Sequence, residues 1–291
     1  MAFDGKYAPP FRRATPKISV SGIGNAEQAL TLIRHFEGTG CNTHVLEVSA
    51  LASQVTLVEL ESSRMALKPS ELGRIGNLIS KTNSSHVLFS VHYGLEPTDG
   101  LSASQLDELR AVSETSPREQ LNSIMEKSHL SMYFDRTAAR YGVQANLGWD
   151  ADVIANFSKM RARFQRIITA MEVRSLDGAS LLRRSESIDH LVINLPREEG
   201  KGFDAAASVA AAKHFLGQNE YLTIGFVGGL TPDTAGGVIR EVAPLAKTSM
   251  FSVGFESGVR TEEGLFDMDK AKAAIEAATS EFSKQRTLLR E

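Results

Sequence analysis

Two glycine-rich turns in the last quarter of the chain have the composition of an anion-binding site. One is Gly228–Pro232 (GGLTP), and the other, Ser257–Val259 (SGV), follows the next β-rich run. Glycines between a strand and a helix let backbone N–H groups approach an anion, and the helix N-terminus adds its dipole. The pair therefore predicts a phosphate site, whose expected residues are Gly228, Gly229, Ser257 and Gly258.

Several ionisable residues near predicted strand ends are candidates for acid–base chemistry. Glu47, Glu59 and Glu256 are carboxylates in such positions, and His92 follows a β-rich run. Carboxylates at strand ends serve as acids or bases in barrel enzymes, although a residue of this kind is individually more often structural. Lys17 could form a Schiff base only if it pointed inward, and its flanking pattern does not indicate that.

These residues lie on an alternation of short β-rich runs and longer helical patterns, which is typical of βα units and a parallel sheet. Eight such units over this length favour a closed (β/α)8 TIM barrel over an open doubly wound sheet. Thr43–Val48 competes with Val55–Leu60 for the second strand, and the sequence leaves that choice open. The predicted strands are Ile18–Ser21, Val55–Leu60, Val87–Val91, Val143–Asn146, Ile167–Ala170, His190–Asn194, Thr223–Val227 and Ser252–Phe255.

The helical patterns complete the units, and one segment interrupts them. We expect a leader over residues 1–16 and a single barrel domain over 17–291. Residues 94–130, polar with a helical tendency, stand where a barrel has one short connection, which predicts an insertion after strand three. Three roles stay open for it: a lid at the barrel mouth, a homo-oligomer contact, or a solvated decoration. The predicted helices are Ala26–His35, Pro69–Lys81, Asp150–Arg163, Ala205–Leu216, Pro232–Leu245 and Asp267–Gln285.

The late glycine turns, together with Asp267–Ala278 (DMDKAKAAIEAA), resemble the C-terminal end of phosphoribosylanthranilate isomerase, the barrel enzyme of tryptophan biosynthesis. Four further pieces resemble that family in the same order along the chain. Together they span most of the chain as short, dispersed motifs and exclude residues 1–16 and 94–130. The pieces are Gly22–Ala29 after strand one, Ser62–Arg64 with Lys68-Pro69, Val143-Gln144 with Gly148, and Gly200–Asp204.

The resemblance implies a cysteine base on strand one and an aspartic acid on strand six. Here Ser21, or Ser19 under a shifted alignment, stands at the cysteine position, and Asn194 replaces the aspartate. A serine hydroxyl without a partner is a poor base, and an amide is no general acid. Gly254 and Asn146 also replace a family aspartate and histidine. The family's chemistry is therefore expected to be absent or altered.

The family's binding residues are better kept than its catalytic pair. Arg64 matches an arginine that clamps the substrate carboxylate, and Lys201 matches a loop lysine. The phosphate turns Gly228–Pro232 and Ser257–Val259 are present as well. The resemblance thus implies a protein that binds a phosphorylated, anionic small molecule.

Composition excludes several other classes of function. The net charge of −3 argues against a nucleic-acid partner, no apolar run is long enough for a membrane span, and the single Cys41 fits a reducing, cytoplasmic location. No cofactor or metal is expected. Three functions stay open: an enzyme with altered isomerase- or lyase-type chemistry, a non-catalytic binding or scaffold protein, and, least favoured, a true phosphoribosylanthranilate isomerase.

Overall fold

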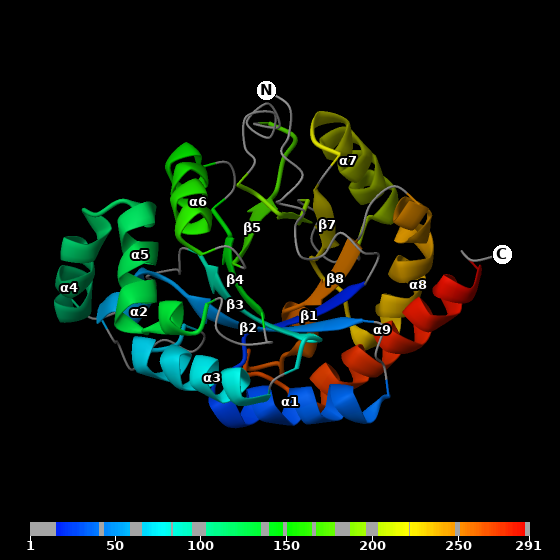
Figure 1. Cartoon of the computed structure of the whole chain (residues 1–291), viewed down its shortest axis with the longest axis horizontal. Helices are drawn as coiled ribbons and strands as arrows, with labels where there is room; N and C mark the ends of the chain where they lie inside the picture. Colours follow the sequence, from blue (N-terminus) through cyan, green and yellow to red (C-terminus); the bar gives the residue numbers. More distant parts are fainter. Residues whose placement is uncertain are drawn as a thin grey trace.

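The computed structural model describes residues 16–40, 44–58, 66–82, 84–94, 103–134, 140–147, 150–164, 167–177, 187–195, 203–220, 222–247 and 251–288. Its centre is a closed barrel in which eight parallel strands pair in chain order and β8 returns to β1 (Figure 1). The TIM-barrel prediction is confirmed. The strands are β1 Lys17–Ser21, β2 Val45–Ala52, β3 Val87–Tyr93, β4 Arg140–Ala145, β5 Ile168–Val173, β6 His190–Ile193, β7 Thr223–Phe226 and β8 Phe251–Phe255.

The second strand corrects one prediction. Of the two candidates for the second strand, the alternative Thr43–Val48 overlaps the observed strand, since β2 begins at Val45. The other candidate, Val55–Leu60, is not a strand where the structure describes it. Gln54–Val58 instead forms the short helix α2, and residues 59–65, including Glu59, lie outside the described residues. The apolar residues of this run pack over the end of the barrel wall as a helix, and an apolar run this short fits either structure.

Helices surround the barrel, and all six helical predictions fall on observed helices. Side chains cap several of these helices: Asn25 accepts from the Gln28 amide at the start of α1, and Thr231 with Thr234 forms a capping box ahead of α8. The larger helices are α1 Ala26–Gly38, α3 Pro69–Thr82, α4 Ala103–Ser113, α5 Pro117–Lys127, α6 Ala151–Arg163, α7 Ala205–Gln218, α8 Pro232–Val242 and α9 Met268–Leu288.

The segment between β3 and β4 does not form an insertion over its whole length. Helix α5 contacts both α3 and α6, so it occupies a place in the ring of outer helices, with Leu121 and Ile124 fully buried. Only α4 is additional, and it packs against α2 at the periphery (Figure 1). The predicted 94–130 insertion is therefore not confirmed, because one of its two helices belongs to the barrel.

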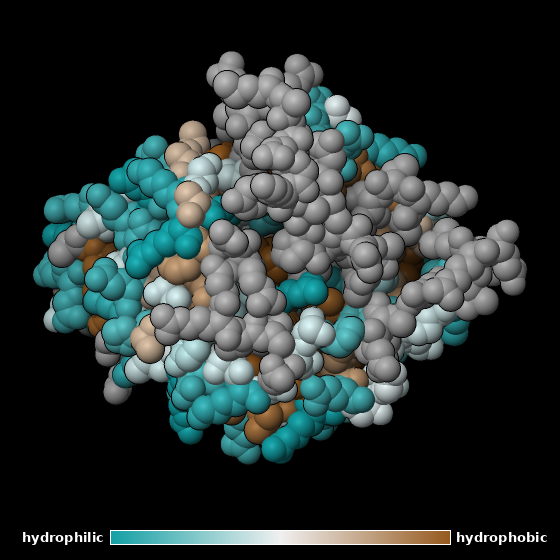
Figure 2. Space-filling model, in the orientation of Figure 1, coloured by the Kyte–Doolittle hydropathy of each residue, from teal (hydrophilic) through white to brown (hydrophobic). Residues whose placement is uncertain are grey.

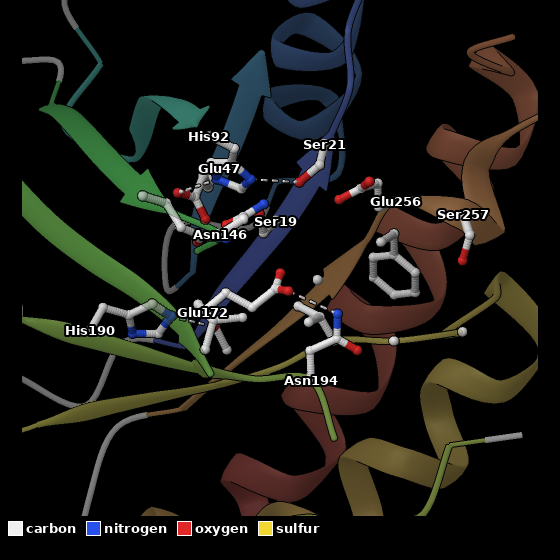
Figure 3. Close-up of a pocket in the computed structure, with 18 of the residues that line it drawn as sticks. Ser19, Ser21, Glu47, His92, Asn146, Glu172, His190, Asn194, Glu256 and Ser257 are labelled. Atoms are coloured by element: carbon white, nitrogen blue, oxygen red, sulfur yellow. Dashed lines mark hydrogen bonds and ion pairs between the residues drawn. The ribbon is translucent and has the colours of Figure 1, made fainter. Parts of the chain in front are cut away.

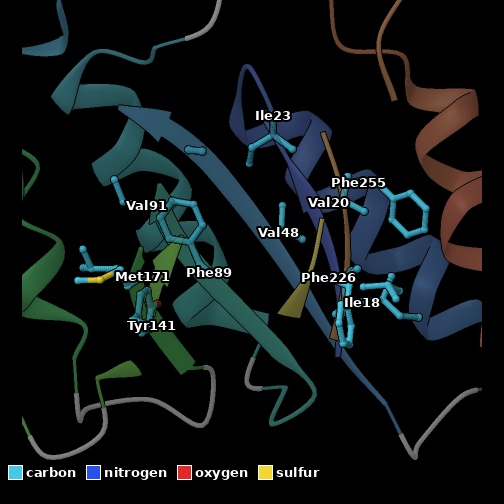
Figure 4. Close-up of a cluster of buried hydrophobic side chains, with 14 of the residues drawn as sticks. Ile18, Val20, Ile23, Val48, Phe89, Val91, Tyr141, Met171, Phe226 and Phe255 are labelled. Atoms are coloured by element: carbon cyan, nitrogen blue, oxygen red, sulfur yellow. The ribbon is translucent and has the colours of Figure 1, made fainter. Parts of the chain in front are cut away.

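The main apolar core lies between the strands and the helices, and a smaller cluster of Val45, Leu88 and Ile168 lies on the inward face of the strands. Successive strand residues point to opposite faces, so in β1 Ile18 and Val20 face the helices whereas Ser19 and Ser21 face inward. Figure 4 shows part of this apolar layer, including Val48 and Phe226. The arrangement leaves the rest of the barrel interior free for polar groups.

The outer surface is consistent with this layering. Figure 2 shows mainly hydrophilic residues over the helices on the visible face of the molecule. Among the described helices, none is both long and apolar enough to cross a bilayer.

Candidate active site

A polar cavity of about 190 Å³ lies inside the barrel, reaching the turns that follow β7 and β8 (Figure 3). Its lining includes residues of β1, β2, β3, β4, β5, β6 and β8, among them His92 on β3 and Glu172 on β5. Both side chains are almost fully buried. In a barrel, side chains at the carboxyl ends of strands are the usual position for catalytic groups. The cavity is therefore the candidate active site.

Glu47 on β2 anchors the first polar cluster of this cavity. One of its oxygens, Oε2, lies 2.7 Å from Lys17 Nζ, and both side chains are less than a tenth exposed. Burial alone would raise the pKa of Glu47, but the Lys17 ammonium and His92 outweigh it and hold that pKa well below its usual value. Lys17 thus points inward, contrary to the sequence interpretation, but as the partner of a carboxylate.

A chain of hydrogen bonds that ends on Glu47 fixes the tautomer of His92. The ionised carboxylate can only accept, so Ser90 Oγ donates to Glu47 Oε1 over 2.6 Å. Because the single hydroxyl proton of Ser90 is donated to Glu47, Ser90 Oγ can only accept the hydrogen bond from His92 Nε2, over 3.0 Å. In the neutral imidazole this leaves Nδ1 unprotonated, and Nδ1 lies 3.4 Å from Ser21 Oγ. The serine at the family's base position therefore has an oriented imidazole beside it.

Glu172 on β5 is the second acid–base group, and Asn194 holds it. Asn194 Nδ2 donates to Glu172 Oε1 over 3.1 Å, and Arg174 Nε donates to the same oxygen over 3.0 Å. Oε2 has no hydrogen-bond partner among the described residues and is left for a ligand. A carboxylate from the neighbouring strand thus lies beside the amide that stands at the family's acid position.

Sequence reasoning missed Glu172 and Arg174 because it ended the fifth strand at Ala170. The observed strand runs to Val173, and alternation then directs Glu172 inward, on the same face as Ala170. The alternating pattern of Ile168–Val173 was a usable signal. It was obscured because the strand carries a charged residue inside the barrel, where apolar residues are usual.

The glycine turns lie at the mouth of the same cavity. Gly228 and Gly229 have φ values of +99° and +69°, in the left-handed region that glycine adopts without strain. A Cβ on Gly228 would lie 2.5 Å from Asn194 Oδ1, so this turn also needs a glycine for space. Gly228, Gly229 and Ser257 line the cavity, whereas Gly258 packs against the backbone of Leu230.

The backbone amides of these turns are candidates for binding an anion, those of Gly228, Gly229 and Ser257 at the cavity and that of Gly258 behind it. None of the amides of Gly228, Gly229, Ser257 and Gly258 donates to a backbone carbonyl among the described residues. Helix α8 begins directly after the first turn, at Pro232, and directs its positive end toward it. Such a group of free amides suits an anion.

Other predicted residues divide into those at the cavity and those outside the described part of the chain. Glu256 lines the mouth, as Figure 3 shows, and Asn146 and Gly254 line the cavity deeper down. A Cβ at Gly254 would lie 2.7 Å from Val227 Cγ1, so the family's aspartate has no room here without rearrangement. Arg64 and Lys201 lie outside the described residues.

His190 on β6 faces the cavity as a neutral residue. Burial, and then the Lys17 ammonium, hold its pKa well below the usual value of 6.5. Its ring bonds to Thr223 Oγ1 at 2.6 Å and to Ser252 Oγ at 3.0 Å. Gly225 makes room for it, because a Cβ there would lie 2.7 Å from Nε2. Both ring nitrogens are thus used within the protein.

Solved structures with a similar fold include two phosphoribosylanthranilate isomerases. Phosphoribosyl anthranilate isomerase from Thermus thermophilus matches with a TM-score of 0.54 and 15% sequence identity, covering 91% of this chain and 98% of that chain. N-(5'-phosphoribosyl)anthranilate isomerase from Pyrococcus furiosus matches with a TM-score of 0.51 and 13% identity, covering 91% and 99%. These neighbours establish the fold.

Concanavalin B matches almost as well, with a TM-score of 0.51 and 11% identity, covering 92% of this chain and 99% of that chain. No protein-family model and no curated protein sequence matches the chain. Because barrels with different names score alike, the function has to be argued from the cavity itself.

Proposed function

We propose that this protein is an acid–base enzyme of the isomerase or lyase type that acts on a phosphorylated, anionic small molecule. One observation carries the proposal. His92 reaches the cavity through Nδ1, whose printed partner is Ser21 Oγ at 3.4 Å, and Glu172 through Oε2, which has no hydrogen-bond partner among the described residues. Both face a single cavity at whose mouth lie the glycine turns, whose amides make no backbone hydrogen bond within the described part of the chain. The turns would hold the phosphate, and the two side chains would exchange protons with the reacting carbons and oxygens.

The two groups take over the roles that Ser21 and Asn194 cannot fill. His92 Nδ1 lies beside Ser21 and can accept a proton from a carbon next to a carbonyl, directly or through the serine hydroxyl. Glu47, through Ser90, stabilises the imidazolium that results. Glu172 Oε2 can protonate or deprotonate an oxygen on the facing side of the substrate. This pairing supports altered chemistry on the isomerase-like scaffold.

The same observation argues against a purely structural or scaffold protein. Ionised carboxylates and an imidazole inside a barrel are costly to bury, and apolar side chains of similar volume would fill the space at less cost. A cavity that keeps such groups around open space is the arrangement expected of a site that handles protons.

Proton transfer can be tested without knowing the substrate in advance. The protein would be incubated in D₂O with triose, tetrose and pentose phosphates that carry a carbonyl, and deuterium entering the carbon next to it would be followed by NMR. We expect exchange with at least one compound and a loss of about 10²–10⁴-fold in Glu172→Gln and in His92→Asn. Glu241→Gln, an exposed change on α8, is the matched control. Exchange that is equal in all variants would refute the assignment.

Phosphate binding has its own matched pair of variants. Gly229→Asp and Gly229→Asn have the same size and both tolerate the positive φ, but only the aspartate places a negative charge at the turn. Inorganic phosphate should bind the wild type and the asparagine variant measurably more tightly than the aspartate variant in calorimetry. Equal binding to both variants would place the phosphate elsewhere.

One specific alternative is that the protein is a phosphoribosylanthranilate isomerase, the enzyme of tryptophan biosynthesis. This hypothesis can be tested directly. The gene would be placed in a tryptophan auxotroph that lacks this isomerase. Growth that depends on Glu172 and His92 would make phosphoribosylanthranilate the substrate. Absence of growth, together with exchange on another phosphate, would give the protein a different substrate.

A further inference from the structure

Three polar side chains of the cavity have hydrogen-bonding atoms with no partner among the described residues. Gln144 Nε2 donates to Asn146 Oδ1 over 2.8 Å, which leaves Gln144 Oε1 as a free acceptor and Asn146 Nδ2 as a free donor. Ser19 Oγ makes no hydrogen bond within the described residues. Ser19 and Gln144 are only 5% and 4% exposed, yet all three line the cavity.

These atoms are arranged along the cavity between the turns and its inner end. Ser19 lies on β1, one step below Ser21 on the inward face, and Gln144 and Asn146 lie on and just after β4. Donors and acceptors thus face the open space from two separate strands of the wall. A polar atom that loses its water when a ligand enters, without gaining a new hydrogen bond, weakens binding, so we expect the ligand of this cavity to supply the partners.

The apolar part of the cavity lining is too small to bind a flat aromatic ring of a ligand favourably. Among the described residues, the aliphatic or aromatic side chains of the lining are Val192, Val227 and Phe255. An aromatic group in this cavity would remove water from Gln144 and Ser19 without offering them hydrogen bonds. Polar binding sites discriminate strongly against a ligand that leaves their polar atoms desolvated and without partners. A chain of hydroxyl groups, each both a donor and an acceptor, matches the free atoms instead.

We infer that the ligand of this cavity is a polyhydroxylated, sugar-like chain, and that Gln144, Asn146 and Ser19 read its hydroxyl groups. The inference rests on the proposed function for the phosphate end of the ligand and adds what the rest of the ligand must be. It separates the protein from an enzyme whose substrate presents an aromatic ring to these strands.

The test compares two phosphates of equal length. Erythritol 4-phosphate and n-butyl phosphate both carry four carbons and one phosphate, and they differ only in three hydroxyl groups. In calorimetry the wild type should bind the polyol about tenfold or more tightly, as two or more extra hydrogen bonds would give. Gln144→Leu should reduce that preference to about equal binding. A wild type that prefers the butyl compound, or a leucine variant that keeps the preference, would overturn the inference.

Two additions keep the outcome independent of folding and of the phosphate site. Asn146→Leu, at a less buried position, repeats the test if Gln144→Leu does not fold, as judged by circular dichroism. Erythritol without phosphate, followed by ligand-observed NMR, tests the hydroxyl contacts alone. If both phosphates fail to bind but erythritol binds in a Gln144-dependent manner, the phosphate assignment fails and this inference stands. If erythritol and its phosphate both fail to bind, the inference is wrong.

Discussion

Glu47 and Glu172 both project into the barrel, but their hydrogen-bond and ion-pair partners engage them differently. We call the Glu47 group, with Lys17 and Ser90, the inner wall, and the Glu172 group, with Arg174 and Asn194, the outer wall. Glu47, near the start of β2, has both oxygens engaged, one by Lys17 and one by Ser90. Glu172, near the end of β5, has both partners on one oxygen, and its ion-pair partner Arg174 is 65% exposed at the mouth. Both oxygens of Glu47 are thus engaged within the protein, where the carboxylate also orients Ser90 and His92, whereas Glu172 keeps Oε2 without a partner among the described residues.

The difference teaches how a barrel can hold charge inside. A buried carboxylate that is fully paired is an anchor, because any change that removes one partner leaves a charge without compensation. A carboxylate that is held by one oxygen keeps its orientation and still has a reactive atom. Substitution of Lys17 on the inner wall should therefore act mainly on the free energy of unfolding. Substitution of Arg174 on the outer wall should act mainly on the reaction with the ligand.

The largest effect is expected from the inner wall. Lys17→Met should destabilise the protein by about 3–5 kcal/mol, because Glu47 stays buried without its cation. Urea unfolding followed by circular dichroism would measure the change. The double variant Lys17→Met with Glu47→Leu should recover most of the loss, since no charge is then left unpaired. A single variant as stable as the wild type would show that the ion pair is not an anchor.

The sequence predicted the barrel well because strands and helices follow from local periodicity. Seven of its strand predictions overlap observed strands, and Val55–Leu60 failed because an apolar run next to a real strand has no periodicity of its own. The site was harder to predict. His92 and Glu47 were named only as separate candidates, and the contact through Ser90 depends on the register of β2 against β3. Glu172 depended on where β5 ends, which is the least certain part of such a prediction.

A pH-dependent effect of intermediate size is expected from His190, which shares the interior with the Glu47 cluster. Its folded-state pKa lies well below 6.5, so the unfolded chain binds the proton more readily. Stability should therefore be unaffected by this group above about pH 6.5 and should fall as the pH decreases from there toward the folded-state pKa, by at most about 1.4 kcal/mol per pH unit.

The control for this effect is His190→Gln, which keeps a polar group near Ser252 without the titration. Its unfolding free energy should depend less on pH than that of the wild type just below pH 6.5. Glu47, whose folded-state pKa is also low, adds its own loss only at more acidic pH, below the usual value of 4.5. Identical pH slopes for the wild type and the variant between pH 6.5 and 5 would contradict the role of His190.

The smallest effect on stability is expected at the mouth, from Arg174. Its pair with Glu172 is largely exposed on the arginine side, and such pairs contribute about 0.2–1 kcal/mol. Arg174→Met should therefore leave the unfolding free energy within about 1 kcal/mol of the wild type. Because Arg174 shares Oε1 with Asn194, its removal should instead loosen the orientation of Glu172 and lower the rate of deuterium exchange, while Arg174→Lys restores part of it. A stability loss as large as that of Lys17→Met would remove the contrast between the two walls, because the outer carboxylate would then be an anchor as well.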